Sequence, residues 1–154
     1  GGPESVRFEK LVSWTERPEE GTRFYSGKAV YRTTFDLTEA GGDARGPGSA
    51  AVPVTRLAMD LGVVKDTGIA RVRLNGQDLG IVWCPPFRVD ISKAVKSAGN
   101  ELEIEVVNSW RNRLIGDRDQ PADKRLTKTN IAVRKDWKPV ESGLLGPMRV
   151  MVEE

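Results

Sequence analysis

Residues 71–80 read RVRLNGQDLG and contain the clearest structural pattern in the chain. Val72 and Leu74 alternate with two arginines, the period of two that places apolar and polar side chains on opposite faces of a β-strand. The dipeptide Asn75-Gly76 follows at once, and both residues tolerate the positive φ angles of a type I′ turn. These ten residues therefore predict a β-hairpin with one buried and one exposed face.

The same alternation recurs along most of the chain. It is found in residues 31–37 (YRTTFDL), 87–91 (FRVDI), 101–108 (ELEIEVVN) and 148–153 (MRVMVE). Residues 54–62 are apolar enough for a strand that is buried on both sides. Helix signals are weak, and we expect only one short turn within residues 93–98. Short strands joined by turn-rich loops predict an all-β fold, an antiparallel β-sandwich of the jelly-roll type, with an up-and-down barrel as the alternative.

The length and composition fit a single globular domain spanning residues 1–154. The chain opens with GGPES and without Met, so we expect a fragment of a larger protein. Residues 39–53 are rich in Gly and Pro without a hydrophobic period, which predicts a flexible loop. The absence of His excludes Ser-His-Asp triads and most imidazole metal sites. The single cysteine, Cys84, is predicted to be a buried structural thiol.

The charge pattern argues against several classes of partner and cofactor. A net charge of +2 gives no general attraction to nucleic acid or to an anionic membrane, so we expect neither partner. Residues 108–126 (NSWRNRLIGDRDQPADKRL) mix cations with acids, which is more typical of a solvated loop than of a single-strand platform. Asp117, Asp119 and Asp123 could ligate calcium, but they lack the rest of an EF-hand pattern, so we expect no cofactor.

Catalysis by this chain itself is not expected. Glycoside hydrolysis needs two carboxylates that face each other across a cleft. The acids Glu101, Glu103 and Glu105 instead alternate on one face of a predicted strand, a pattern far more typical of a solubilising surface. A stand-alone hydrolase is therefore the least favoured of the alternatives.

Residues 110–117 offer the side chains that a sugar site needs. Pyranose rings present apolar C–H faces that lie on Trp or Tyr, and hydroxyl groups that pair with planar donors and acceptors. Aromatic residues of other loops could reach the same rim of a jelly roll. The candidate carbohydrate-binding residues are Trp110, Asn112, Arg113, Asp117, Trp83, Tyr25 and Trp137. For each aromatic residue alone, core packing or loop anchoring is the commoner role.

Four segments together resemble a known kind of module. They are residues 24–37, 60–92, 100–117 and 142–150. In their order and content they resemble the galactose-binding-like, jelly-roll sugar-binding domain of glycoside hydrolases. The resemblance is strongest to the C-terminal domain of α-L-rhamnosidase-like enzymes of glycoside hydrolase family 106, which is related to the sugar-binding domain of family 2.

The resemblance implies an accessory domain without catalysis of its own. Its partners would be an oligo- or polysaccharide and a neighbouring catalytic domain in the parent chain, in a periplasmic or secreted protein. Residues 108–117 would form a structured loop that either lines a sugar site or docks on the neighbouring domain. The alternative is a structural interdomain module that binds no sugar by itself, because fold alone does not settle function.

Overall fold

The computed structural model describes residues 1–37 and 56–153. Its strands are β1 (Lys28–Phe35), β2 (Arg56–Asp60), β3 (Val63–Lys65), β4 (Ile69–Leu74), β5 (Gln77–Val82), β6 (Arg88–Asp90), β7 (Asn100–Val107), β8 (Gly143–Gly146) and β9 (Arg149–Glu153). Its helical segments are η1 (Trp14–Glu16), α1 (Glu20–Arg23), α2 (Arg111–Arg118) and η2 (Ala122–Lys124). The loop predicted for residues 39–53 lies outside the described residues. Within the described part of the chain, no helix combines the length and the apolar character needed to cross a membrane.

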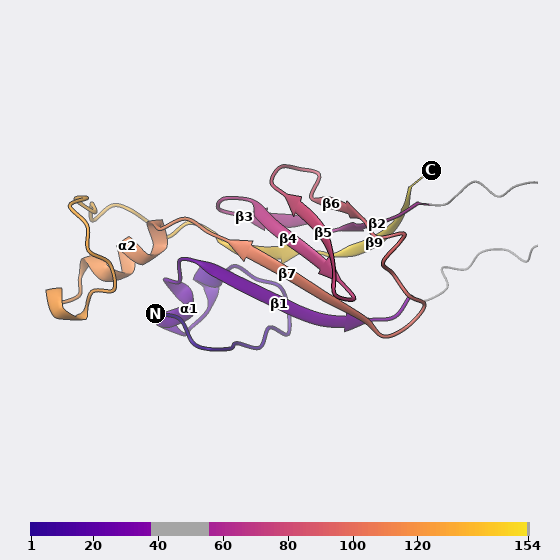
Figure 1. The fold of residues 1–154 in the computed structure, drawn as a ribbon. Helices are drawn as coiled ribbons and strands as arrows, with labels where there is room; N and C mark the ends of the chain where they lie inside the picture. The colour runs from indigo at the N-terminus through magenta and orange to yellow at the C-terminus, as the bar shows by residue number, and fades with distance from the viewer. Residues whose placement is uncertain (38–55, 154) are drawn as a thin grey trace, which may run out of the picture.

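Two layers of antiparallel strands enclose one core (Figure 1). The main sheet has the strand order β1-β7-β4-β5, and the other layer holds the sheet β6-β2-β9 and the pair β3-β8. Strand β7 pairs with β1 on one side and with β4 on the other. Apart from the β4–β5 hairpin, the neighbouring strands of this sheet are thus far apart in sequence, unlike those of an up-and-down barrel. The predicted all-β sandwich is confirmed.

Strands β4 and β7 bury the side chains that the pattern assigns to the core, whereas Val150 and Val152 of the last alternating segment are exposed. Leu74 and Val72 of β4 are fully buried, and so are Ile104 and Val106 of β7. The turn between β4 and β5 has φ angles of 52° at Asn75 and 80° at Gly76, as the predicted hairpin requires. The core of the sandwich therefore follows directly from the period of two.

The outer face of the main sheet carries paired charges. Arg32 of β1 lies opposite Glu103 of β7, and the two side chains form an ion pair with an N···O distance of 2.7 Å. Lys28 pairs with Glu105 on the same two strands at 3.1 Å. These glutamates neutralise cations of the neighbouring strand, in keeping with a surface role.

One local prediction was confirmed with a shift in position, and one was wrong. The short turn expected within residues 93–98 begins two residues earlier, where the amides of Ala94 and Val95 donate to the carbonyl of Ile91. Cys84 is exposed and not buried, because it follows the edge strand β5 in a loop whose other residues 83–86 are also exposed. Trp14, for which we expect a place in the core or at an interface, lies in the core.

Candidate functional site

The polar segment after β7 is a helix and not the structured loop expected for it. Residues 111–118 form α2, and residues 110–140 together project beyond the end of the sheets (Figure 1). We call residues 110–140 the α2 limb. Leu114 and Ile115 are buried, and Gly116 is needed because a Cβ there would lie 2.7 Å from the side chain of Phe24. An apolar face of two residues is too short to produce a recognisable helical period, so the helix escaped prediction.

Asn112 joins the α2 limb to the start of β8. Its side chain is 1% exposed, and its Nδ2 donates to the carbonyl of Val140 and to Oγ of Ser142, both at 2.8 Å. Its Oδ1 accepts the amide N–H of Val140, also at 2.8 Å. Because the amide is engaged in three internal hydrogen bonds, Asn112 holds the backbone in place and has little capacity left for a ligand.

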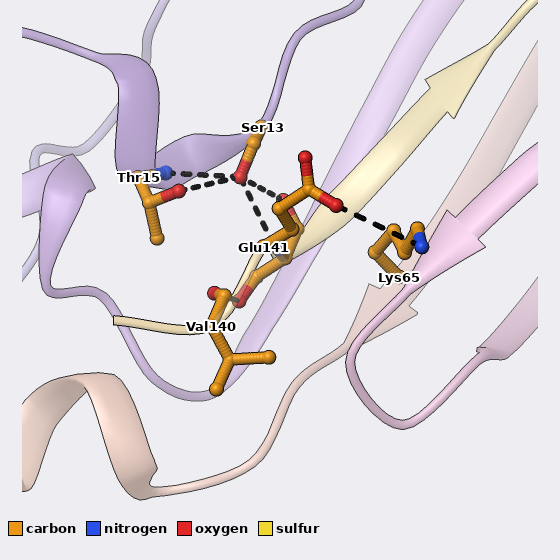
Figure 2. A network of polar contacts seen from close by, with 6 residues as sticks. Ser13, Thr15, Lys65, Val140 and Glu141 are labelled. Carbon is orange, nitrogen blue, oxygen red and sulfur yellow. Dashed lines mark hydrogen bonds and ion pairs between the residues drawn. The ribbon is translucent and has the colours of Figure 1, made fainter. Parts of the chain in front are cut away.

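The contacts of Asn112 continue into a second polar cluster. The amide of Ser142 donates to Oγ of Ser13 at 3.0 Å, and the amide of Thr15 donates to the same oxygen at 3.2 Å. Figure 2 shows Ser13 between Thr15 and the segment of Val140 and Glu141, with Glu141 paired to Lys65. The limb is thereby connected through buried hydrogen bonds to the N-terminal part of the chain.

Asp117 fixes the second half of the α2 limb. Its Oδ2 accepts hydrogen bonds from the amide and from Oγ1 of Thr127, both at 2.7 Å. Arg113 donates to its Oδ1 at 3.4 Å, one turn earlier on the helix. Burial disfavours the charged carboxylate, but the hydrogen bonds from Thr127 and the charge of Arg113 outweigh it, so the pKa of Asp117 lies below its ordinary value. Asp117 thus acts as a negatively charged anchor for the returning chain.

A pocket of about 200 Å³ lies where the α2 limb meets the N-terminal part of the chain. Its lining residues are Gly1, Tyr25, Ser26, Trp110, Arg113, Leu126 and Thr127. We call it the Trp110 pocket. Trp110 is 70% exposed, whereas the Arg113 side chain is 15% exposed. The structure therefore brings three of the predicted site residues, Trp110, Arg113 and Tyr25, to one pocket.

Tyr25 contributes to this pocket with part of its surface. Its hydroxyl donates to the carbonyl of Lys28 at 2.8 Å, and its ring meets the edge of Trp14 at a centroid distance of 5.6 Å. The ring is thereby fixed against the core, so Tyr25 forms a wall and not a free stacking platform.

The remaining two aromatic candidates lie outside the Trp110 pocket. Trp83 is 72% exposed in the loop between β5 and β6. The start of β4 pairs with the end of β5 on one side and with the end of β7 on the other. Trp83 follows β5 and Trp110 follows β7, so both lie at the same end of the sheet, with β4 between their strands. Trp137 is covered by the guanidinium of Arg111, 4.9 Å from its ring centroid. Neither ring lines the pocket.

Sequence reasoning missed two hydroxyl residues of the pocket, Ser26 and Thr127. Oγ of Ser26 accepts the amide N–H of Arg113 at 3.1 Å, across 87 residues of sequence. Thr127 reaches the pocket through its two hydrogen bonds to Asp117. Such long-range contacts leave no local pattern, although Ser26 does adjoin Tyr25, which the sequence had singled out.

Two of the three aspartates considered for calcium are engaged by neighbouring side chains. Asp117 is bound by Thr127 and Arg113, and Asp119 pairs with Arg118 at 3.0 Å. Within residues 1–37 and 56–153, no three acidic, Cys or His residues gather in a geometry that could hold a metal ion.

Comparison with known proteins places the chain beside glycoside hydrolases. No protein-family model matches it. It is 34% identical, over 96% of its length, to a protein of Formosa agariphila named as a candidate β-glucuronidase. The structure of a rhamnosidase from Novosphingobium sp. PP1Y matches 99% of the chain with a TM-score of 0.83 and 37% identity. A β-glucuronidase of Bifidobacterium dentium matches 68% of the chain with a TM-score of 0.51 and 24% identity, a likeness of fold.

The chain covers only a small part of each of these proteins. It spans 14% of the Formosa protein and 13% of the Novosphingobium rhamnosidase. The chain therefore corresponds to one domain-sized part of much longer glycoside hydrolases. The predicted resemblance to a domain of a glycoside hydrolase, with a rhamnosidase among the similar structures, is confirmed.

Proposed function

We propose that this chain is a non-catalytic accessory domain of a glycoside hydrolase, a galactose-binding-like jelly roll that contacts carbohydrate at the Trp110 pocket. The observation that carries the proposal is a 70% exposed tryptophan at the edge of a pocket with polar walls. The flat face of an exposed indole suits the apolar face of a pyranose ring. The small share of the relatives that the chain covers supports an accessory role.

The pocket residues divide into contact and positioning roles. Trp110 would stack on the sugar ring, and the guanidinium of Arg113 would donate to its oxygens. Ser26 and Thr127 add hydroxyl groups to the wall. Asn112 and Asp117 would act indirectly by holding the α2 limb in shape. The pocket is smaller than the roughly 300–1,000 Å³ of drug-sized sites, which suits a single sugar unit of a longer chain.

The carboxyl groups support the absence of catalysis. A general acid in glycoside hydrolysis needs a raised pKa so that it is protonated near neutral pH. The described carboxyl groups whose pKa departs from the ordinary value, such as Asp60, Asp90 and Asp117, all have it lowered by hydrogen bonds or nearby cations. Such groups are permanent anions at neutral pH and suit structural roles.

A matched pair of tryptophan variants tests the carbohydrate contact. The chain would be titrated with rhamnose-, galactose- and uronate-containing oligosaccharides by isothermal calorimetry. Trp110→Ala should weaken binding about three- to tenfold, the usual contribution of a stacked aromatic ring. Trp83→Ala removes an equally exposed ring outside the pocket and should leave the affinity unchanged. Equal losses in both variants, or a loss in Trp83→Ala alone, would contradict the proposed site.

An interdomain role is the second candidate, and a different surface favours it. A groove of about 880 Å³ runs between residues 3–11 and β1, and residues 28–33 along β1 line it. No backbone hydrogen bond joins residues 3–11 to β1, so the free edge of this strand faces the groove. Thr22 also lines it, with a buried hydroxyl that has no partner among the described residues. An extended segment of a neighbouring domain would pair with such an edge.

The two candidate functions give opposite results in the same titration. If the folded chain binds none of the oligosaccharides and its tryptophan fluorescence stays constant, the interdomain role is favoured. Binding that depends on Trp110 favours the carbohydrate role.

A further inference from the structure

Positive charge is concentrated in the α2 limb. Residues 110–140 contain nine Lys or Arg and four Asp, whereas the whole chain has a net charge of only +2. The rest of the chain therefore carries an excess of negative charge. Three of the four acids are paired within the limb, with Arg113, Arg118 and Arg134. The limb is thus a basic projection on an otherwise acidic domain.

Most cations of the limb are not neutralised by a carboxylate of the described residues. Among the described residues, six have no carboxylate within ion-pair distance. They are Arg111, Lys124, Arg125, Lys128, Lys135 and Lys138. Arg125 and Lys128 flank the pocket residues Leu126 and Thr127 in the sequence. The cationic surface therefore adjoins the Trp110 pocket.

Arg113 is the cation inside the pocket, and its guanidinium is only partly engaged. Its one side-chain hydrogen bond within the described residues is the 3.4 Å contact from Nη1 to Asp117. The other oxygen of that carboxylate is bound more closely, at 2.7 Å, by Thr127. A guanidinium carries five N–H donors, so most of those of Arg113 remain for a ligand.

We propose that the Trp110 pocket binds the anionic group of an acidic saccharide, a uronate carboxylate or a sulfate ester, through Arg113 while the sugar ring lies on Trp110. This inference rests on the proposed carbohydrate-binding function. The planar guanidinium matches the paired oxygens of either anion. The first turn of α2 contains Arg113 and no acidic residue. The partial positive charge at the N-terminus of this helix is therefore not neutralised there and adds to the attraction of Arg113 for an anion.

A saccharide suits this site better than an acidic protein surface. A protein partner needs a broad contact area with several buried anchors. Here the exposed indole and the half-paired guanidinium converge on about 200 Å³. Arg125 and Lys128, which flank pocket residues in the sequence, would then attract the further charges of a repeating acidic polysaccharide.

The test compares matched ligands that differ only in charge. The 154-residue chain would be titrated with an oligouronate and its carboxyl-reduced neutral form, and with a sulfated galactan fragment and its desulfated form. We expect the oligouronate or the sulfated fragment to bind about tenfold or more tightly than its neutral form. The preference should shrink between about 0.01 and 0.15 M salt, where the screening length shortens from about 30 to about 8 Å. The stronger of the two acidic ligands identifies the anion.

Three variants locate the preference. Arg113→Lys keeps the charge but loses the planar fork, and should reduce the preference severalfold. Lys128→Gln changes an exposed side chain next to a pocket residue in the sequence, so the variant should fold normally. Its affinity for acidic ligands should fall more than its affinity for neutral ones. Arg32→Gln on the outer face of the main sheet should change nothing.

The outcomes separate this inference from the function on which it rests. Equal affinity for acidic and neutral forms would overturn the anion preference and leave sugar binding intact. No binding of any ligand to the folded chain would overturn both. A preference that survives Arg113→Lys unchanged would remove Arg113 from the site.

Discussion

The sandwich and the α2 limb are stabilised by different kinds of interaction. In the sandwich, the buried positions of β4 and β7 are apolar, apart from Asn100 at the start of β7, and they alternate with exposed or half-exposed charges. In the limb, the buried side chains include Asn112 and Asp117, whose shortest hydrogen bonds, at 2.7–2.8 Å, reach partners 10 to 30 residues away along the chain. Apolar burial is spread over many residues, whereas the limb depends on a few polar ones. The limb should therefore lose its structure separately, and without unfolding the sandwich.

The largest effect is expected in the core of the sandwich. Ile104→Ala removes a side chain that is 1% exposed in the central strand β7, and should lower the free energy of unfolding by about 2–5 kcal/mol. Chemical denaturation followed by circular dichroism measures this loss. Ile81→Ala is the matched control. Because Ile81 is 58% exposed, its substitution should lower the free energy of unfolding by less than about 0.5 kcal/mol. Similar losses in the two variants would contradict the assigned core.

A smaller and localised effect is expected for Asn112→Ala. The substitution removes the three hydrogen bonds that Asn112 makes with Val140 and Ser142, at a cost of about 1–3 kcal/mol. Hydrogen exchange should become faster at Val140 and stay unchanged at Ile104. Asn130→Ala, at an exposed position of the same limb, should leave both amides unaffected. Faster exchange throughout the sandwich would show that limb and sandwich form one cooperative unit.

Asp117→Asn should lower the free energy of unfolding by about 1 kcal/mol, and this loss should depend on pH. The loss is small because the amide keeps one oxygen that can accept a hydrogen bond from Thr127. The pKa of Asp117 is lowered in the folded state, so its stabilisation is complete above the ordinary value near about 4 and is lost as the pH falls through the folded value. The stability gap between the parent chain and the variant should therefore narrow in acid. Denaturation at a series of pH values measures it, with Asp123→Asn as the exposed control. A gap that widens in acid would contradict the role of Asp117 as a charged anchor.

The smallest effect is expected on the outer face of the main sheet. Arg32→Ala breaks the ion pair between Arg32 and Glu103. Both side chains of this pair are in contact with water. Such pairs contribute about 0.2–1 kcal/mol. Thermal unfolding at low and high salt measures the difference, which should vanish at high salt. A loss comparable to that of Ile104→Ala would show that these charges are more than a surface feature.

The sandwich could be predicted from the sequence because each strand repeats the same short pattern. Val72 and Leu74, for example, needed only their neighbours to be assigned to the core. Cys84 could not be placed in this way, since its exposure depends on the edge position of β5 and not on the adjacent Trp and Pro residues.

The candidate site was predictable only in part. Trp110 and Arg113 were found because a sugar site needs an aromatic face and planar donors. Asn112 and Asp117 also carry planar polar groups of the kind that bind sugar hydroxyls. Only the structure shows that these groups are hydrogen-bonded to Val140 and Thr127. A helix that buries polar residues through distant partners gives no periodic signal.

The four tryptophans permit the most direct test, because each indole N–H gives its own NMR signal in a different region. Two-dimensional spectra would be recorded while an oligosaccharide that binds the chain is added. We expect the Trp110 signal to move most, while those of the buried Trp14 and of Trp83 stay in place. A shift at Trp83 without one at Trp110 would contradict the proposed site.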